Sequence, residues 1–266
     1  AGASESEHAI RLRGIESMAT HRLEELRRTA PPADGPPESW MWVPAIFGFP
    51  VESEAPLLRR LPLLTWGIAL FVLMTSVVAF IDPKVAVEQF AFVPADAFRL
   101  GGLTFLTAFF LHAGPVHLIG NLYFLLIFGD NVEDFLGRWR YTLLLVGSTV
   151  MGSLVHLLFD PESTRPCIGA SGGISGVIMF YALQYPQARL GLNIWIRMMP
   201  RWIEMPAWGA MTLWMGLQLL ILAQQRLGTS NVAATAHLGG ALAGFLAWIL
   251  WRRFAWSPPE EPESAG

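Results

Sequence analysis

Charged side chains are scarce in this chain of 266 residues: only 15% are Asp, Glu, Lys or Arg, whereas a soluble domain usually carries about a quarter. Lysine is nearly absent: Lys84 is the one lysine beside 17 arginines, and the formal net charge is -3. A nucleic-acid-binding protein needs a basic face, so this composition argues against that class. The single cysteine, Cys167, excludes an internal disulfide and a cysteine-based metal cluster.

Apolar residues are abundant instead, at 53% of the chain, and the mean hydropathy is +0.43. A helix that spans a membrane needs about 20 apolar residues. Proline suits the first position of a helix, so Gly114-Pro115 separates one such helix from the apolar stretch before it. The sequence therefore predicts an all-α membrane protein with six spanning helices, at 61–81, 115–136, 141–159, 167–185, 207–225 and 232–251.

The basic residues near these six runs predict the orientation of the chain. With the N-terminus inside, the inner segments hold nine arginines, and the outer segments hold four basic residues. This distribution follows the positive-inside rule, so both termini are predicted to be cytoplasmic. The connection 82–113 is predicted to lie partly in the membrane surface.

Three regions differ in composition. Residues 1–55 are predicted to form a cytosolic or interfacial arm, with a charged helical stretch, a Pro/Gly linker "PPADGPPES" and the aromatic-rich "WMWVPAIFGFP". Residues 56–255 are predicted to form the six-helix core. Residues 256–266 are predicted to be a disordered tail.

Polar side chains inside the apolar runs are few, and each is a functional hypothesis because polar groups are costly in a bilayer. The notable ones are His117, Asn121, His156, Ser171, Ser175 and His237. At about 1.5 Å of rise per residue, four of them lie within roughly 10 Å of the outer ends of three helices: His117, Asn121, Ser171 and His237. His156 has no partner in this set and is interpreted as structural. His112, just outside the second run, is expected to brace the connection.

These four residues have complementary chemistry. Serine becomes a nucleophile when a histidine takes its proton, and the oxyanion of acyl transfer needs hydrogen-bond donors. His117 and Asn121 are four residues apart, so they share one helix face and can both donate. No carboxylate lies at this depth, so a dyad of Ser171 and His237 is predicted rather than a triad.

The segment "GASGGISG" contains two candidate nucleophiles, Ser171 and Ser175. Ser171 is predicted to react because it lies in the first turn of its helix, where backbone N–H groups have no partner within the helix. Ser175 lies one turn deeper, and its hydroxyl is expected to bond back to the preceding turn.

Glycines at small-xxx-small spacing let helices pack closely, and this reading competes with catalysis for a Gly-x-Ser-Gly in an apolar helix. The first two glycines of the fourth run are expected to let the backbone approach substrate and a neighbouring helix, and the last two to contact the sixth helix: Gly169, Gly172, Gly173 and Gly176. On the sixth helix, Gly240 and Gly244 form a ridge that is expected to pack against the start of the fourth.

Together these motifs resemble those of the rhomboid intramembrane serine proteases over about residues 60–255. The motifs are "HAGPVHLIGN", "EDFLG", "GASG" and "AHLGGALAG", in the order found in that family. The resemblance implies Ser171 as nucleophile, His237 as general base, and His117, Asn121 and the Ser171 N–H as oxyanion hole. The remaining motif positions are interpreted as structural: His112, Glu133, Gly137, Gly169, Gly172, Gly240 and Gly244.

The resemblance further implies cleavage of single-pass transmembrane proteins near the outer membrane boundary, without a cofactor or metal, by a multi-pass protein of the inner (cytoplasmic) membrane. Two positions depart from the family. Many members carry a Trp-Arg pair in the first outer loop, where this chain reads "GGLTFLTAFF". Some members stack the catalytic histidine on a tyrosine at the position of Ser175, so another group must orient His237 here.

Two other functions stay open at this point. A rhomboid-like protein could bind membrane clients with little or no proteolytic turnover. A small transporter fits less well, because the sequence shows no pair of broken spans in repeated halves. The sequence leaves the substrate, the oligomeric state and the role of residues 1–55 open.

Overall fold

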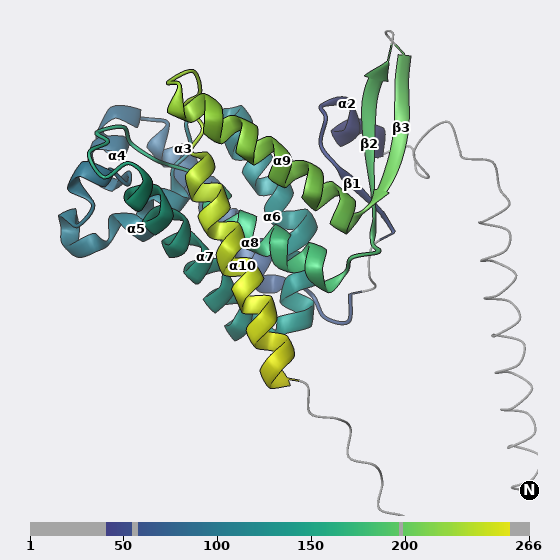
Figure 1. The fold of residues 1–266 in the computed structure, drawn as a ribbon. Helices are drawn as coiled ribbons and strands as arrows, with labels where there is room; N and C mark the ends of the chain where they lie inside the picture. Colours follow the sequence, from purple (N-terminus) through teal and green to yellow (C-terminus); the bar gives the residue numbers. More distant parts are fainter. Residues whose placement is uncertain (1–40, 55–57, 197–198, 256–266) are drawn as a thin grey trace, which may run out of the picture. The chain divides into compact units, whose positions relative to one another are not determined.

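A computed structural model describes residues 41–54, 58–196 and 199–255 (Figure 1). The charged stretch and the Pro/Gly linker expected within residues 1–40 lie outside the described residues, as does the expected tail 256–266. The chain divides into two compact units. One comprises Val51–Leu190 and Glu204–Gly266, and the other comprises Ala1–Pro50 and Gly191–Ile203.

The described part of the chain is mostly helical. Its long helices are α3 (Leu63–Ala79), α6 (Pro115–Leu136), α7 (Arg138–Phe159), α8 (Ser171–Gln184), α9 (Ala207–Arg226) and α10 (Ala234–Ala255). Between α3 and α6 lie α4 (Pro83–Phe90), η2 (Pro94–Asp96), η3 (Arg99–Gly102), α5 (Thr104–Thr107) and η4 (Ala108–Phe110). The remaining elements are α2 (Trp42–Ile46), β1 (Val51–Glu54), β2 (Arg189–Ile196) and β3 (Met199–Pro206).

Each of the six apolar runs overlaps one of the long helices, so a mostly helical membrane protein is confirmed. The predicted all-α class is wrong in one respect, because the described residues also form a three-stranded sheet. The bounds of α6 agree with the prediction, because Pro115 does occupy its first turn. The fourth helix differs: α8 begins at Ser171 and has 14 residues, so it is only about 21 Å long. That is shorter than the roughly 30 Å hydrocarbon core of a bilayer.

Three helices are long and apolar enough to cross a membrane by themselves: α7, α9 and residues Ala234–Arg253 of α10. Two bent pairs also pass this test when each is taken as one span. The first pair, α3 with α4, is bent by 119° at its break, and the second, Thr104–Phe110 with α6, is bent by 99°. The described residues thus form a multi-span helical membrane protein, and the six-span count and the orientation of the termini stay predictions.

The strands were not predicted from the sequence. Strands β2 and β3 form a hairpin in the connection between α8 and α9, and β1 extends the sheet in the order β1-β2-β3. At the start of β2, the Ser53 hydroxyl of β1 donates to the Arg189 carbonyl over 3.3 Å. The segment "RLGLNIWI" ends in Ile194, Trp195 and Ile196, and such β-branched and aromatic residues favour strands. This was a signal that the sequence analysis missed.

Strand β1 also supplies a buried carboxyl group to the helices. The Tyr181 hydroxyl of α8 donates to Glu52 Oε1, and the Asn131 amide of α6 donates to Glu52 Oε2 over 3.3 Å. Burial, with a smaller contribution from the neighbouring Asp130 carboxylate, raises the pKa of Glu52 from its ordinary value to about 7. This group joins β1 to α6 and α8 at the end of α6 that holds Asn131, away from His117.

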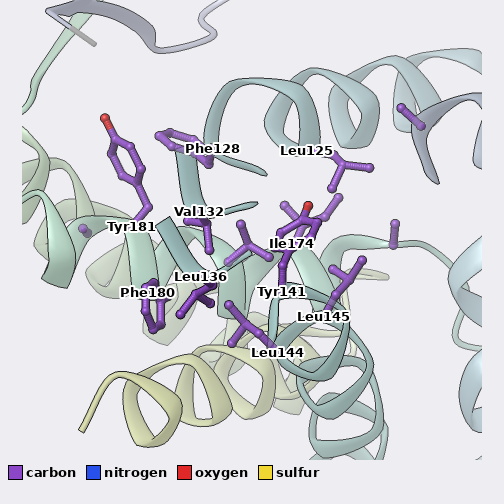
Figure 2. Packing of buried hydrophobic residues seen from close by; sticks show 14 of the residues in the cluster. Leu125, Phe128, Val132, Leu136, Tyr141, Leu144, Leu145, Ile174, Phe180 and Tyr181 are labelled. Atoms are coloured by element: carbon purple, nitrogen blue, oxygen red, sulfur yellow. The ribbon is translucent and has the colours of Figure 1, made fainter. Parts of the chain in front are cut away.

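The apolar core lies between α6, α7 and α8. The α6 residues Leu118, Leu125 and Val132 recur every seven positions and are all buried, which is the helical spacing of one face. Figure 2 shows Leu125 and Val132 with Leu144 of α7 and Ile174 of α8, around Tyr141. This packing holds α6 and α8, which carry His117, Asn121 and Ser171, against α7.

Glu133, interpreted from the sequence as structural, caps another helix. The N-terminus of α3 has no side-chain cap of its own, and its first N–H groups need acceptors. The Glu133 carboxylate accepts from the backbone N–H groups of Leu64, over 3.1 Å, and Thr65, over 2.7 Å. It also accepts from the Thr65 hydroxyl at 2.8 Å. Gly137 follows with a φ of +75°, where α6 turns into α7, so this motif joins α3, α6 and α7.

Glycines let α10 lie directly against α8, and Figure 1 shows these two helices beside α7. A Cβ placed on Gly240 would overlap the Gly172 carbonyl, and one on Gly244 would overlap the Gly176 carbonyl. Gly172 and Gly176 are four residues apart and therefore share the face of α8 that meets α10. The expected ridge of Gly240 and Gly244 is thus in contact with the start of α8.

The expectation for Gly173 was wrong. A Cβ on Gly173 would overlap the Thr149 hydroxyl of α7, and it would lie 3.0 Å from Phe109. Helix α8 packs against both α7 and α10. Gly173 directly follows Gly172, so it points about 100° further round the helix, toward α7. Gly173 therefore admits α7, whereas Gly176 contacts both Ser148 of α7 and α10.

Replacing Gly240 by alanine should lower both stability and any activity of the protein. The added methyl group must push α10 away from the Gly172 carbonyl, and overpacking commonly costs about 1–3 kcal/mol. The control is Gly216→Ala on α9, where the added Cβ has no described atom within 4 Å and helix propensity gains about 1 kcal/mol. Thermal unfolding in detergent measures the difference. A Gly240→Ala protein as stable as the control would show that the two helices separate freely.

Candidate active site

Ser171 and His237 are in direct contact. The Ser171 hydroxyl lies at the first residue of α8, and His237 lies in the first turn of α10. The distance from His237 Nε2 to Ser171 Oγ is 2.8 Å, which is a normal hydrogen-bond length. A serine within hydrogen-bond reach of a histidine is the arrangement that generates a nucleophile.

Ser175 points elsewhere. Its hydroxyl donates to the Ser171 carbonyl over 2.6 Å, and its side chain is 2% exposed. The predicted bond of Ser175 to the preceding turn is therefore confirmed. With its hydroxyl proton engaged and its surface covered, Ser175 has no histidine beside it in the hydrogen bonds of the described residues.

The second ring nitrogen of His237 meets a residue that the sequence analysis missed. His237 Nδ1 lies 2.8 Å from Gln218 Oε1 of α9, and Gln218 is 5% exposed. The Trp214 ring, one turn earlier on α9, lies with its centroid 6.4 Å from that of His237. A signal was present in the sequence: Gln218 is an uncharged polar residue inside an apolar run, where each polar group is costly.

His117 is held in one tautomer by a backbone N–H group just before α6. The backbone N–H of Ala113 donates to His117 Nδ1 over 3.2 Å, so a neutral ring carries its proton on Nε2. That nitrogen would lie 2.9 Å from a Cβ on Gly169, and the same Cβ would lie 3.7 Å from Ser171 Oγ. Gly169, with a φ of +124°, thus leaves open the space between the His117 N–H and the serine.

Asn121 lies on the same face of α6, one turn after His117. Its amide donates to the His117 carbonyl over 2.8 Å, and its side chain is buried. An amide NH₂ group has two N–H donors, so this bond engages one of them. The second N–H is the one that Asn121 could offer to a substrate.

Two further histidines, His112 and His156, form hydrogen bonds that join different parts of the fold. His112 Nδ1 lies 2.9 Å from the Ser76 hydroxyl of α3, and its Nε2 accepts from the Ala170 N–H at 3.5 Å. This places His112 between α3 and the residue before Ser171. His156 of α7 does have a partner, because its Nδ1 lies 2.6 Å from the Thr235 hydroxyl, two residues before His237.

The loop before Ser171 is tied to the connection between α3 and α6. Phe92 and Cys167 form an antiparallel bridge with N–H to carbonyl distances of 3.1 and 2.7 Å, and the Gly169 N–H donates to the Ala108 carbonyl over 2.9 Å. Within the connection, the Arg99 guanidinium donates to the carbonyls of Glu88 and Ala91. Arg99 therefore braces the connection in this chain, which lacks the Trp-Arg pair in "GGLTFLTAFF".

Comparison with known protein families gives one matching domain model. The model is described as the rhomboid domain, and it matches residues 100–254. This range includes α6 to α9 and all of α10 except its last residue, and with them every candidate catalytic and oxyanion residue.

Curated relatives carry rhomboid names as well. The chain is 29% identical over 174 residues to the presenilin-associated rhomboid-like protein A, mitochondrial, of Danio rerio, which covers 63% of this chain and 43% of that protein. It is 31% identical over 150 residues to RHOMBOID-like protein 5 of Arabidopsis thaliana, covering 56% and 44%. It is 28% identical over 146 residues to the rhomboid protease GluP of Bacillus subtilis (strain 168), covering 53% and 24%.

In these comparisons the chain spans less than half the length of each relative. The domain match, by contrast, covers more than half of this chain and contains the contact between Ser171 and His237. The chain belongs to the rhomboid family.

Proposed function

We propose that this protein is an intramembrane serine endopeptidase that cleaves single-pass transmembrane proteins near the outer membrane boundary. The observation that carries the proposal is the 2.8 Å contact between His237 Nε2 and Ser171 Oγ. It is supported by relatives that are named as proteases, among them the rhomboid protease GluP of Bacillus subtilis and a rhomboid-type serine protease of Emericella nidulans.

In the proposed reaction, His237 Nε2 takes the hydroxyl proton of Ser171 while Oγ attacks the substrate carbonyl carbon. The new C–O bond leaves a negative charge on the carbonyl oxygen. The protonated Nε2 then gives its proton to the leaving amine nitrogen as the C–N bond breaks. Water attacks the resulting acyl-enzyme through the same base and releases the new carboxyl terminus.

The negative charge needs donors that already point at it. The His117 Nε2–H is available because Nδ1 accepts from Ala113. The Ser171 N–H is available because it is the first of α8 and has no partner within the helix. The positive end of the α8 dipole adds to this stabilisation. Asn121 contributes its second amide N–H.

The short α8 supports a water-filled site below the membrane surface. A spanning helix needs about 20 residues, and α8 has 14. The non-helical residues before Ser171 would then lie at membrane depth. Such backbone is tolerated where it is buried in protein or lines a water-filled cavity, and hydrolysis needs that water.

The membrane setting is part of the proposal. We propose six spans with both termini cytoplasmic, in which α3, α6, α7, α8, α9 and α10 each form one span. The orientation is proposed from the distribution of arginines, and the inner cytoplasmic membrane from the resemblance to rhomboid proteases; the relatives include mitochondrial proteins. Residues 56–255 would form the protease core, with residues 1–55 as a peripheral arm.

Removing one oxyanion donor should slow cleavage strongly. Loss of a single donor typically costs on the order of 10²–10³ in rate, so His117→Ala and Asn121→Ala should each fall in that range. Asn121 also bonds the His117 carbonyl, so thermal unfolding must be measured alongside. A variant whose melting temperature drops but whose rate per folded molecule is normal would assign that residue a structural role.

The proposed function is tested with purified protein in liposomes and a single-pass substrate. Wild-type protein should produce two fragments cut near the outer boundary, and Ser171→Ala should produce none. Binding of the substrate without cleavage by folded wild-type protein would contradict the proposal and favour a client-binding function.

A further inference from the structure

His237 has a partner at each ring nitrogen, and the two partners differ in chemistry. Nε2 faces the Ser171 hydroxyl and Nδ1 faces Gln218 Oε1, both at 2.8 Å. A neutral imidazole carries one proton, so one nitrogen donates and the other accepts. An amide oxygen can only accept. Nδ1 must therefore carry the proton, and Nε2 is left with the lone pair that faces the serine.

We infer that Gln218 is the positioning residue of the site: its amide oxygen holds His237 in the tautomer whose Nε2 can take the Ser171 proton. This inference rests on the proposed function of Ser171 and His237. Gln218 does not contact the serine in the described hydrogen bonds, and it acts through His237.

Helix α9 is built to supply this contact. Trp214 and Gln218 are four residues apart and share one face; Trp214 lies beside the His237 ring and Gln218 bonds its nitrogen. The residue at position 175 cannot take this role, because the Ser175 hydroxyl is turned to the Ser171 carbonyl. The orientation of His237 therefore comes from α9 and not from α8.

An amide suits this place better than a carboxylate. Gln218 is buried at 5% exposure, and a charged group placed there would lose its hydration at a large cost unless it were paired. A neutral amide selects the tautomer without burying a charge, as asparagine does in cysteine proteases of the Cys-His-Asn type. The opposite amide orientation would donate to Nδ1, place the proton on Nε2 and disable the base.

The direct test measures the tautomer. The two ring nitrogens of His237 are observed by ¹⁵N NMR of histidine-labelled protein in detergent at a pH where the ring is neutral, and the signals are assigned by their loss in His237→Gln. We expect the proton on Nδ1 in wild-type protein and a mixture of tautomers in Gln218→Met. A proton on Nε2 in the wild type, or an unchanged tautomer in Gln218→Met, would overturn the inference. This readout does not depend on proteolysis.

Kinetics then separates positioning from packing. Gln218→Met keeps the side-chain volume and removes the acceptor, so kcat should fall between about 10-fold and the roughly 10⁴-fold seen when a protease histidine is held in the wrong tautomer. Gln218→Glu restores an acceptor and should recover part of that loss. The control Met211→Leu changes a buried side chain of the same helix and should leave kcat within about threefold, since volume-conserving swaps are well tolerated.

The outcomes distinguish the inference from the proposed function. If wild-type protein cleaves no substrate but carries the proton on Nδ1, the proposed function fails and the role of Gln218 in holding the tautomer stands. If wild-type protein cleaves and Gln218→Met keeps the wild-type kcat, the inference fails and the proposed function stands.

Discussion

Ser171→Ala should abolish cleavage of a transmembrane substrate, whereas Ser175→Ala should keep measurable cleavage. The first change removes the oxygen that forms the bond to substrate, 2.8 Å from His237 Nε2. Loss of a catalytic serine in a serine protease costs on the order of 10⁶ in kcat. The second change removes a hydroxyl that donates to the Ser171 carbonyl, and a single hydrogen bond is worth only about 0.5–1.5 kcal/mol.

The two serine variants control for each other, because they remove the same atom one helical turn apart. Both should be compared at equal amounts of folded protein, judged by thermal unfolding. Cleavage by Ser171→Ala with a silent Ser175→Ala would reverse the assignment of the nucleophile.

His237→Ala should lower the rate of cleavage at least about 10³-fold, since it removes the base on which serine dyads and triads depend. The matched histidine is His156, which bonds the Thr235 hydroxyl near the start of α10. His156→Gln should lower stability while it keeps most of the activity of each folded molecule. Rates are measured on the same transmembrane substrate in liposomes, and near wild-type cleavage by His237→Ala would end the dyad proposal.

The helices could be predicted because each has a strong local signal. Proline fixed the start of α6 at Pro115, and apolar runs marked the other long helices. Strands β2 and β3 of the hairpin have only eight residues each, too few to stand out beside apolar runs of about 20 residues. The fourth helix was expected to start near residue 167, whereas α8 begins at Ser171. The preceding residues bond to the connection at Phe92 and Ala108 instead of forming a helical turn.

The contact of Ser171 with His237 agrees with what depth along the helices suggested, since depth can be counted from sequence. The partners of Gln218 and Glu133 could not be found in this way. Which face of α9 meets α10, and which helix start lies beside Glu133, depend on how the helices rotate and pack. Gly173 was assigned to the wrong neighbour for the same reason. The spacing of the glycines indicates that another helix packs closely, but only the packing shows that this helix is α7.

The central claim is that Ser171 is an activated nucleophile, and a fluorophosphonate probe tests it most directly. Folded wild-type protein in detergent is treated with the probe, digested, and analysed by mass spectrometry, beside His237→Ala and Ser171→Ala. We predict one adduct on Ser171 in wild type, a much slower reaction in His237→Ala, and none at this position in Ser171→Ala. An adduct on Ser175, or no labelling of protein shown to be folded by its thermal unfolding, would contradict the account.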